Sequence, residues 1–199
     1  MKAQIVDGPF RKADYPIFPT LVQVHKIDIT EPNLRYIKEF NDVTDWPEDI
    51  GVGKTSSQAN LHFLNKDKLK DLKRTIMERV DEYCFTAGLD SVEMSMSWIN
   101  YQTKEGFVAP HRHQLSVVSG AYYPICDKDS APLVFDSPIL GPKMAEIHNQ
   151  ATEYTADKME FVPQPGMLIL FPSWLYHHSL PNKTDERITI SFNTYHKIG

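Results

Sequence analysis

The second half of the chain consists of short strand-like runs separated by turn residues. Between Val92 and Trp98, apolar and polar residues alternate one by one, which is the period of a β-strand with one buried face. Turn signals such as Gln164-Pro165-Gly166 divide the stretches that follow. The further strand-like runs cover residues 115–125, 131–135, 160–163, 167–171 and 187–192. Many short strands joined by turns are typical of a β-sandwich or a β-barrel, so residues 91–199 are expected to form an all-β, barrel-like core.

Residues 1–90 are expected to form an α/β portion that supports this barrel. After Asn65, a residue type suited to a helix N-cap, apolar residues recur at spacings of three and four, and Gly88 is a suitable helix end. The apolar stripe consists of Leu69, Leu72, Ile76, Val80 and Tyr83. Upstream, the pattern predicts a strand at 21–24, a helix at 34–40 and a loop at 47–60. A chain of 199 residues suits one domain, so residues 1–199 are interpreted as a single unit.

Charge and composition exclude several other classes of protein. The net charge of −5 and the pI of about 5.9 give no basic footprint for nucleic acid. No run of 18 apolar residues offers a membrane span, and the N-terminal residues lack the apolar core of a secretion signal. Cys84 and Cys126 stand outside any metal-binding spacing and are expected to be buried free thiols. The sequence predicts a soluble cytoplasmic protein without membrane or nucleic-acid partners, and a homodimer stays an open option.

Four of the eight histidines cluster in two places. The first is His111-Arg112-His113: residues i and i+2 of a strand share a face, so the two imidazoles can aim at one point while Arg112 faces away. The second is the adjacent pair His177 and His178, of which only one can join a common site, because strand neighbours point to opposite faces. An HxH pair on its own is more often a pair of surface histidines than a metal site. The wider pattern is what favours a metal site here.

The run at 187–192 adds a cation to this pattern. One of its faces is apolar, and the other is polar throughout, formed by Arg187, Thr189, Ser191 and Asn193. A wholly polar face on such an apolar strand should look into a wet pocket or out to solvent. A hairpin between His177 and Arg187 would bring the chain back beside the histidine strand and place the guanidinium near a bound metal. A planar, permanently charged guanidinium is well suited to clamp a carboxylate.

These residues also resemble a known protein family. The HxH motif, the segments SGAYYP and GMLILFPSWLYHH, and then ERITISFN are similar to the 2-oxoglutarate/Fe(II)-dependent oxygenases found in phage and bacterial genomes, which are similar in turn to the prolyl-hydroxylase-like oxygenases. The resemblance is good over about residues 95–195 and weak in the N-terminal half. It implies a double-stranded β-helix, a jelly-roll or cupin-like barrel, flanked by a helix. It also implies Fe(II) as cofactor, 2-oxoglutarate as co-substrate, and a host-cytoplasmic location if a phage encodes the chain.

Carried over by position, the resemblance assigns roles to six residues. The implied metal ligands are His111, His113 and His177. The implied 2-oxoglutarate ligands are Arg187, Tyr123 and Thr189. No other catalytic residue is implied. The chain departs from the family at His113, because relatives have a carboxylate there and non-haem Fe(II) oxygenases typically use two histidines and one carboxylate. Three neutral histidines leave the iron with its full charge, so we expect weaker iron binding and a higher redox potential, with the chemistry retained.

The choice between His177 and His178 depends on spacing. In related sequences the ligand lies three residues after the tryptophan of SWL and four before a proline, and Trp174 and Pro181 both select His177. His178 stays the alternative, since the strand period alone cannot separate adjacent residues. The other histidines are expected to have no role in the site; they are His25, His62, His148 and His196.

Three functions follow as hypotheses. The first is a 2-oxoglutarate-dependent dioxygenase that hydroxylates an unknown small-molecule or peptidyl substrate and releases succinate and CO2. The second is a three-histidine iron dioxygenase that needs no keto acid, and the third is a metal-binding barrel without catalysis. The position of Arg187 favours the first.

Some residues are candidates for contact with the substrate. Relatives place substrate-covering segments where residues 136–160 lie in this chain. The candidates in that segment are Pro138, Pro142, Met144 and Tyr154. Trp98 and Asn100 are candidates for the pocket wall, although residues in such positions are more often part of the core.

Overall fold

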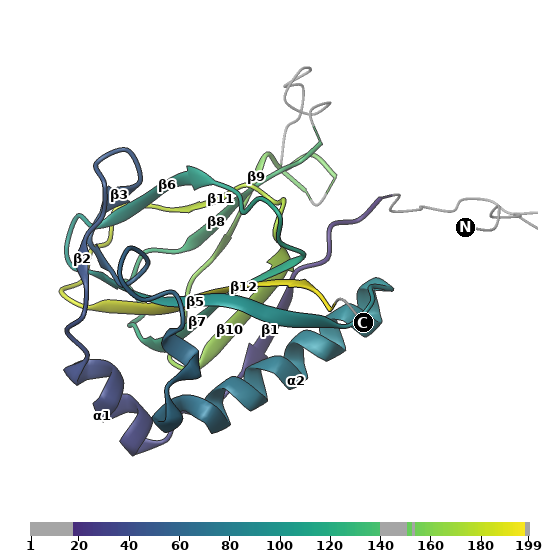
Figure 1. The fold of residues 1–199 in the computed structure, drawn as a ribbon. Coiled ribbons are helices and arrows are strands. Elements are labelled where there is room, and N and C mark those ends of the chain that lie inside the picture. Colours follow the sequence, from purple (N-terminus) through teal and green to yellow (C-terminus); the bar gives the residue numbers. More distant parts are fainter. Residues whose placement is uncertain (1–17, 140–150, 153, 198–199) are drawn as a thin grey trace, which may run out of the picture.

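Two antiparallel β-sheets face each other across the interior of the molecule (Figure 1). The computed structural model describes residues 18–139, 151–152 and 154–197. The larger sheet contains, in spatial order, β1 (Gln23–Lys26), β10 (Met167–Pro172), β7 (Val118–Ile125), β12 (Arg187–His196), β5 (Val92–Gln102), β4 (Lys54–Thr55) and β2 (Thr44–Asp45). The smaller sheet contains β3 (Gly51–Val52), β6 (Phe107–His111), β11 (His177–Ser179), β8 (Leu133–Asp136) and β9 (Lys158–Phe161). Neighbouring strands pair antiparallel in both sheets, so the predicted mainly β, barrel-like core is confirmed.

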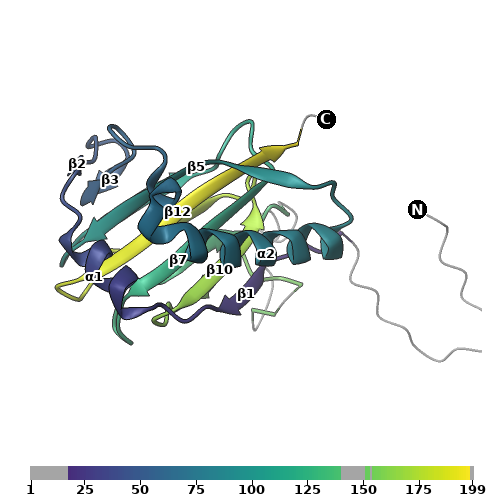
Figure 2. The same ribbon diagram turned by 60° about the horizontal axis from the view of Figure 1, so that its bottom comes forward.

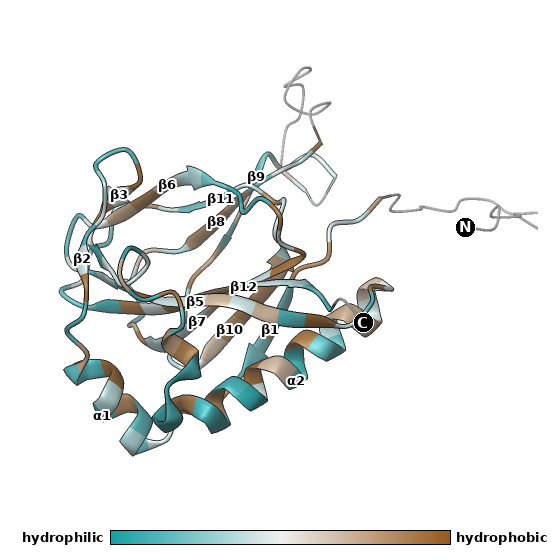
Figure 3. Ribbon diagram, viewed as in Figure 1, coloured by the Kyte–Doolittle hydropathy of each residue, from teal (hydrophilic) through white to brown (hydrophobic). Residues whose placement is uncertain are grey.

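The long helix α2 (Lys70–Ala87) lies across the outer face of the larger sheet (Figures 1 and 2). The helix predicted at 34–40 is present as α1 (Glu31–Glu39). Strand β10 beneath α2 is largely hydrophobic (Figure 3), and the predicted stripe is buried against this face. The stripe residues of α2 in this core are Leu72, Ile76, Val80 and Tyr83. No helix in the described ranges is long and apolar enough to cross a membrane.

The start of α2 differs from the prediction, and its end agrees with it. Asn65 does not cap α2, because it ends a 3-10 turn, η1 (Phe63–Asn65), and a second turn, η2 (Asp67–Leu69), comes before the helix. The side chain of Asn65 instead accepts a hydrogen bond from Lys73 Nζ at 2.6 Å. Gly88 adopts the left-handed conformation at φ 69° and its N–H caps the last turn, as its position predicted.

Two predictions for the N-terminal half need correction. The first strand covers Gln23–Lys26 rather than 21–24, because its register is set by pairing with β10, where Gln23 lies opposite Leu170. The segment 47–60 is not only a loop, since β3 pairs with β6 in the smaller sheet and β4 pairs with β5 in the larger one. This segment therefore connects the edges of the two sheets and closes one side of the barrel.

The two faces of β12 separate the core under α2 from the interior of the barrel. Ile188, Ile190 and Phe192 are fully buried in the core cluster that includes α2. The alternate residues point between the sheets and line a cavity, as expected of a polar face; they are Arg187, Thr189, Ser191 and Asn193.

The predicted hairpin between His177 and Arg187 is not formed. Strand β11 pairs with β6 and β8 in the smaller sheet, whereas β12 lies between β5 and β7 in the larger one. Residues 180–186 therefore cross from one sheet to the other, and the buried Asn182 holds this crossing through a hydrogen bond from its Nδ2 to the carbonyl oxygen of Gln102 (3.3 Å). A spacing of ten residues is long enough for the crossing as well as for a hairpin. Arg187 still shares a cavity with the histidines, because that cavity lies between the sheets.

Gly120 on β7 leaves room for the ring of Phe192. A Cβ at this position would lie 2.2 Å from Phe192 Cζ and 3.0 Å from Leu170 Cδ2, and the ring of Phe192 is fully buried. We expect Gly120→Ala to lower the free energy of unfolding by about 1–3 kcal/mol, the usual cost of overpacking a core, as measured by chemical denaturation. Phe192→Leu in the same background should recover part of the loss. An unchanged denaturation midpoint in Gly120→Ala would contradict this tight packing.

Candidate metal centre

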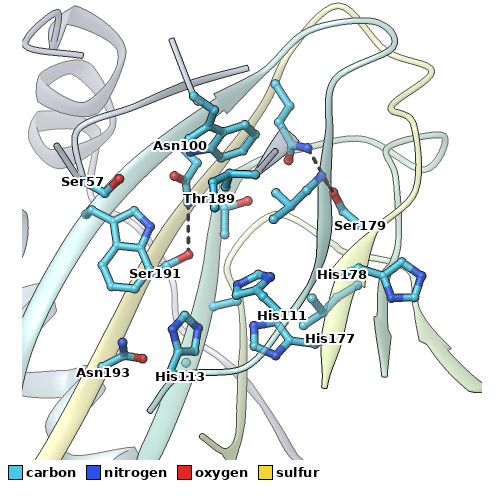
Figure 4. A pocket seen from close by; sticks show the side chains of 18 of the residues that line it. Ser57, Asn100, His111, His113, His177, His178, Ser179, Thr189, Ser191 and Asn193 are labelled. Carbon is cyan, nitrogen blue, oxygen red and sulfur yellow. Dashed lines mark hydrogen bonds between the residues drawn. The ribbon is translucent and has the colours of Figure 1, made fainter. Parts of the chain in front are cut away.

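Three histidines converge between the two sheets (Figure 4). His111 ends β6 and His177 begins β11, and the two residues lie opposite each other in the register. His113 lies beyond the end of β6, so the HxH pair is not on one strand as predicted; the N–H of His113 donates to the carbonyl oxygen of Ser173 at 2.9 Å. Each of the three side chains nevertheless places one ligand atom within 4.8 Å of the others, close enough for a single metal ion after small side-chain movements.

Backbone hydrogen bonds fix two of the imidazole rings. Nδ1 of His111 lies 2.8 Å from the carbonyl oxygen of Ala109, and Nδ1 of His177 lies 2.9 Å from that of Leu175. Because a carbonyl oxygen can only accept, each Nδ1 carries the proton and each Nε2 keeps its lone pair. Metal-binding histidines commonly have their tautomer fixed in this way. The donor set therefore fits a metal ion on grounds that are independent of the sequence motif.

Burial keeps these imidazoles neutral. It lowers the pKa of His113 to about 4 and that of His177 to about 3, and the neighbouring histidines add to both effects. Burial also lowers the pKa of His111, although the hydrogen bond to Ala109 opposes the shift. At neutral pH all three rings thus offer a lone pair instead of a proton, which metal binding requires.

His178 lies outside this cluster. It points away from the three converging rings (Figure 4), and its Nδ1 lies 3.7 Å from Oδ2 of Asp136. That nitrogen is buried and has no hydrogen-bond partner within the described part of the chain. The structure thus brings together the three histidines selected by spacing and leaves His178 out of the group, although His178 also borders the cavity.

Arg187 is a buried cation in the same cavity. It is 3% exposed, and its guanidinium donates from Nε to the carbonyl oxygen of Ala131 (3.0 Å), from Nη1 to Thr189 Oγ1 (3.2 Å) and from Nη2 to Tyr123 Oη (3.5 Å). None of the carboxylates in the described ranges lies within ion-pair distance of it. A buried charge without a partner is unfavourable, so this guanidinium is well placed to receive an anion.

Gln102 is a site residue that the sequence analysis missed. It is 2% exposed, its Oε1 accepts a hydrogen bond from Arg187 Nη1, and its Nε2 donates to Ser179 Oγ at 3.0 Å. It therefore links the larger sheet to the smaller one beside the guanidinium. The signal was present in the sequence, because the alternation that makes Trp98 and Asn100 candidates for the pocket wall extends to Gln102, and all three line the cavity.

The cavity has a volume of about 270 Å3 and contains both the histidines and Arg187. One wall is formed by β5 and β12, whose side chains face each other in successive pairs. From the arginine outward, these pairs are Gln102 with Arg187, Asn100 with Thr189, Trp98 with Ser191, and Met96 with Asn193. The segment 47–60, which connects the two sheet edges, adds Ile50 and Ser57, and Trp46 just before it also lines the cavity; the sequence analysis did not assign these residues to the site.

The remaining candidates lie elsewhere. His25, His62 and His196 are outside the cluster, as predicted, and both cysteines are buried free thiols. Pro138 and Tyr154 line a different cavity, of about 600 Å3 beside β8 and β9, instead of the cavity that holds the histidines. Other candidates fall outside the described residues; they are Pro142, Met144 and His148.

The barrel places three converging histidines and a buried arginine in one cavity between its sheets, which is the arrangement expected of a double-stranded β-helix oxygenase. Residues 96–193, which run from β5 to β12, match the sequence profile of the family described as "Putative 2OG-Fe(II) oxygenase". The matched residues, which make up about half of the chain, belong to this 2OG-Fe(II) oxygenase family. None of the curated proteins compared with the chain matches it.

Solved structures of low sequence identity share the fold. A Pseudomonas putida prolyl-4-hydroxylase is 13% identical with a TM-score of 0.60, and the match covers 89% of this chain and 94% of that one. A Trichoplax adhaerens prolyl hydroxylase, solved with a peptide fragment of the hypoxia inducible factor oxygen degradation domain, is 10% identical with a TM-score of 0.61, covering 87% and 83%. HygX from Streptomyces hygroscopicus, solved with nickel, 2-oxoglutarate and hygromycin B, is 10% identical with a TM-score of 0.53, covering 88% and 83%. The chain spans 53% of a further family member, from Burkholderia pseudomallei. The predicted double-stranded β-helix is thereby confirmed.

Proposed function

We propose that this chain holds one Fe(II) through His111, His113 and His177, binds 2-oxoglutarate at Arg187, and oxidises an organic substrate. The observation that carries the proposal is the buried guanidinium of Arg187, which shares a cavity with the three imidazoles and has no anion beside it in the described ranges. A metal site alone would need no such cation. 2-Oxoglutarate has a carboxylate at each end, so one end suits the guanidinium and the keto-acid end suits a metal ion.

The residues around Arg187 would orient the co-substrate. Burial raises the pKa of Tyr123, so its hydroxyl stays protonated and can donate to the carboxylate that the guanidinium binds. The hydroxyl of Thr189 lies beside the same group, and Gln102 restricts the rotation of the guanidinium. A carboxylate would thus meet donors that are already in place, which reduces the entropy lost on binding.

Bound iron and 2-oxoglutarate would supply the oxidising chemistry, in which O2 and the keto acid yield succinate and CO2 while one oxygen atom enters a C–H bond of the substrate. The part of the three histidines is to hold the ion with neutral donors, so that it keeps its 2+ charge. The dianionic co-substrate would neutralise this charge. Metal and co-substrate should therefore favour each other's binding more strongly than in a site where a carboxylate ligand has already reduced the charge.

One observation favours a second candidate function, an iron dioxygenase that uses no keto acid. The three-histidine donor set suits such an enzyme equally well, because imidazole alone can hold the iron. In that function Arg187 would have no co-substrate to bind, which is why we place it second. In either case we propose a small organic molecule or a peptide as substrate.

An anaerobic titration separates the two functions. Iron-loaded protein should bind one equivalent of 2-oxoglutarate in a calorimeter and develop a weak visible absorption band, because the keto acid chelates the metal. Metal-free protein should bind the keto acid at least about tenfold more weakly, since the two ligands are coupled. Iron binding without 2-oxoglutarate binding would reject the co-substrate and favour the second candidate. Failure to bind iron would reject both enzymes.

A further inference from the structure

The end of the cavity away from Arg187 is formed by the last two facing pairs, Trp98 with Ser191 and Met96 with Asn193. We propose that this end takes an uncharged part of the substrate, a group with an apolar body and a carbonyl-type oxygen that accepts a hydrogen bond from Nδ2 of Asn193. The inference rests on the proposed function, since it places the substrate beside a metal ion held by the histidines.

The side-chain amide of Asn193 is held in place through its oxygen, and its Nδ2 has no acceptor among the described residues. Asn193 lines the cavity and is only 3% exposed, and its Oδ1 accepts a hydrogen bond from Ser119 Oγ at 2.7 Å. Ser119 Oγ lies 2.8 Å from Ser173 Oγ, so the hydroxyl that holds the amide is itself held. Nδ2 has no hydrogen-bond partner in the part of the chain that the structure describes. Because the amide is bound through its oxygen, its N–H groups remain available to a molecule in the cavity.

The contacts of Asn193 place it near the proposed metal ligands. The carbonyl oxygen of Ser173, whose hydroxyl contacts Ser119, accepts the hydrogen bond from the N–H of His113. The ring of His113 lies 5.8 Å from that of Trp98, between centroids. Figure 4 shows Asn193 next to His113, on the side of the cluster away from His178. An atom held by Nδ2 would therefore lie close to the metal centre and far from the guanidinium.

The walls at this end favour a neutral group. Among the described residues that line the cavity, and with the histidines neutral, Arg187 is the one charged side chain. It lies six residues from Asn193, which is about 20 Å along a strand. The nearer walls are apolar, and the side chains that form them include Leu61, Met96 and Trp98. With the charge of the metal offset by bound 2-oxoglutarate, an ammonium or a carboxylate would lose its hydration here without gaining a charged partner, whereas an apolar ring could lie against the indole of Trp98.

Three small probes with the same six-membered ring test the inference: cyclohexanone, cyclohexylamine and cyclohexanecarboxylate. At neutral pH the first is an uncharged acceptor, the second a cation and the third an anion. Protein loaded with Mn(II) and 2-oxoglutarate broadens the NMR lines of any probe that binds beside the metal. We expect the wild-type protein to bind cyclohexanone at least about fivefold more tightly than either charged probe.

Substitutions at Asn193 test the hydrogen bond itself. Asn193→Leu removes the donor at similar volume, and Asn193→Asp turns it into an acceptor while Ser119 can still donate to it. Both should weaken cyclohexanone binding about fivefold, and Asn193→Asp should now prefer cyclohexylamine. The matched control is Asn65→Asp, which makes the same substitution at an amide outside the cavity, where the side-chain oxygen accepts from Lys73. This control should keep the wild-type order of the probes.

Calorimetry of Mn(II) and 2-oxoglutarate, performed first, keeps the inference separate from the proposed function. Failure of either to bind would count against the proposed function. If both bind, three results would overturn the inference about the substrate: a wild-type preference for a charged probe, no broadening of any of the three probes, or wild-type affinity for cyclohexanone in both Asn193 variants.

Discussion

Arg187→Ala is expected to weaken 2-oxoglutarate binding by about 2–5 kcal/mol, the usual loss when one partner of a buried charge pair is removed. Metal binding should stay nearly intact, because the hydrogen bonds of the guanidinium involve none of the three histidines. Arg187→Lys should recover only part of the affinity, since an ammonium cannot make the bidentate contact. Calorimetric titration of 2-oxoglutarate into the Mn(II)-loaded wild type and variants measures these differences.

Gln102→Glu tests the same interaction between Arg187 and 2-oxoglutarate without changing Arg187 itself. The substitution keeps the size of the side chain but puts a carboxylate where the neutral Oε1 now accepts from Arg187. The guanidinium would then have an internal anion, so the affinity for 2-oxoglutarate should fall toward that of Arg187→Ala.

Equal binding by the wild type and Arg187→Ala would remove Arg187 from the site. If Arg187 instead formed only an ion pair at the surface, its removal would change the free energy of binding or unfolding by less than about 1 kcal/mol.

Alanine at His111, His113 or His177 is expected to abolish stoichiometric Fe(II) binding, whereas His178→Ala should retain it. Each of the first three contributes one of the three converging ligand atoms, and two imidazoles alone hold an iron ion weakly. His178 faces Asp136 instead. Iron content after anaerobic reconstitution and removal of unbound metal measures the outcome.

The His178→Ala variant is also the control for folding. His177 and His178 are adjacent on β11 and are 5% and 7% exposed, so the two truncations remove the same group at nearly the same depth. The melting temperatures of the metal-free variants, followed by circular dichroism, should therefore be similar. Iron retained by His177→Ala and lost from His178→Ala would reverse the assignment of the distal ligand.

Periodicity predicted the elements whose two faces differ most. The alternation in β5 and β12 and the stripe on α2 each reflect a face that is buried and a face that is not, and this difference is encoded locally. The start of α2 was predicted wrongly. Asn65 is of a residue type that commonly caps helices, but it ends one 3-10 turn, and a second 3-10 turn lies between it and α2. The predicted bounds of the first strand were two residues too early, because the register of this strand depends on pairing with β10, which is more than 140 residues away in the sequence.

The site was predictable where neighbours in sequence are neighbours in space. The spacing of Trp174 and Pro181 selected His177, and the structure places that residue in the cluster. The route from His177 to Arg187 was predicted wrongly, because a spacing of ten residues does not tell whether the chain turns back within one sheet or crosses to the other. Gln102 was missed because its role depends on Arg187 and Ser179, which come from two other strands in two different sheets.

The crossing between β11 and β12 has a consequence for the rigidity of the barrel. The three histidines belong to the smaller sheet and the turn that continues it, whereas Arg187 belongs to the larger sheet. A metal ion on its own would fasten together parts of one layer. A keto acid that reaches from that ion to Arg187 would add a connection between the two sheets beside the hydrogen bond from Gln102 to Ser179, so the barrel should be more rigid with both ligands bound than with the metal alone. Binding of both ligands would therefore prepare the site for oxidation and make the barrel more rigid at the same time.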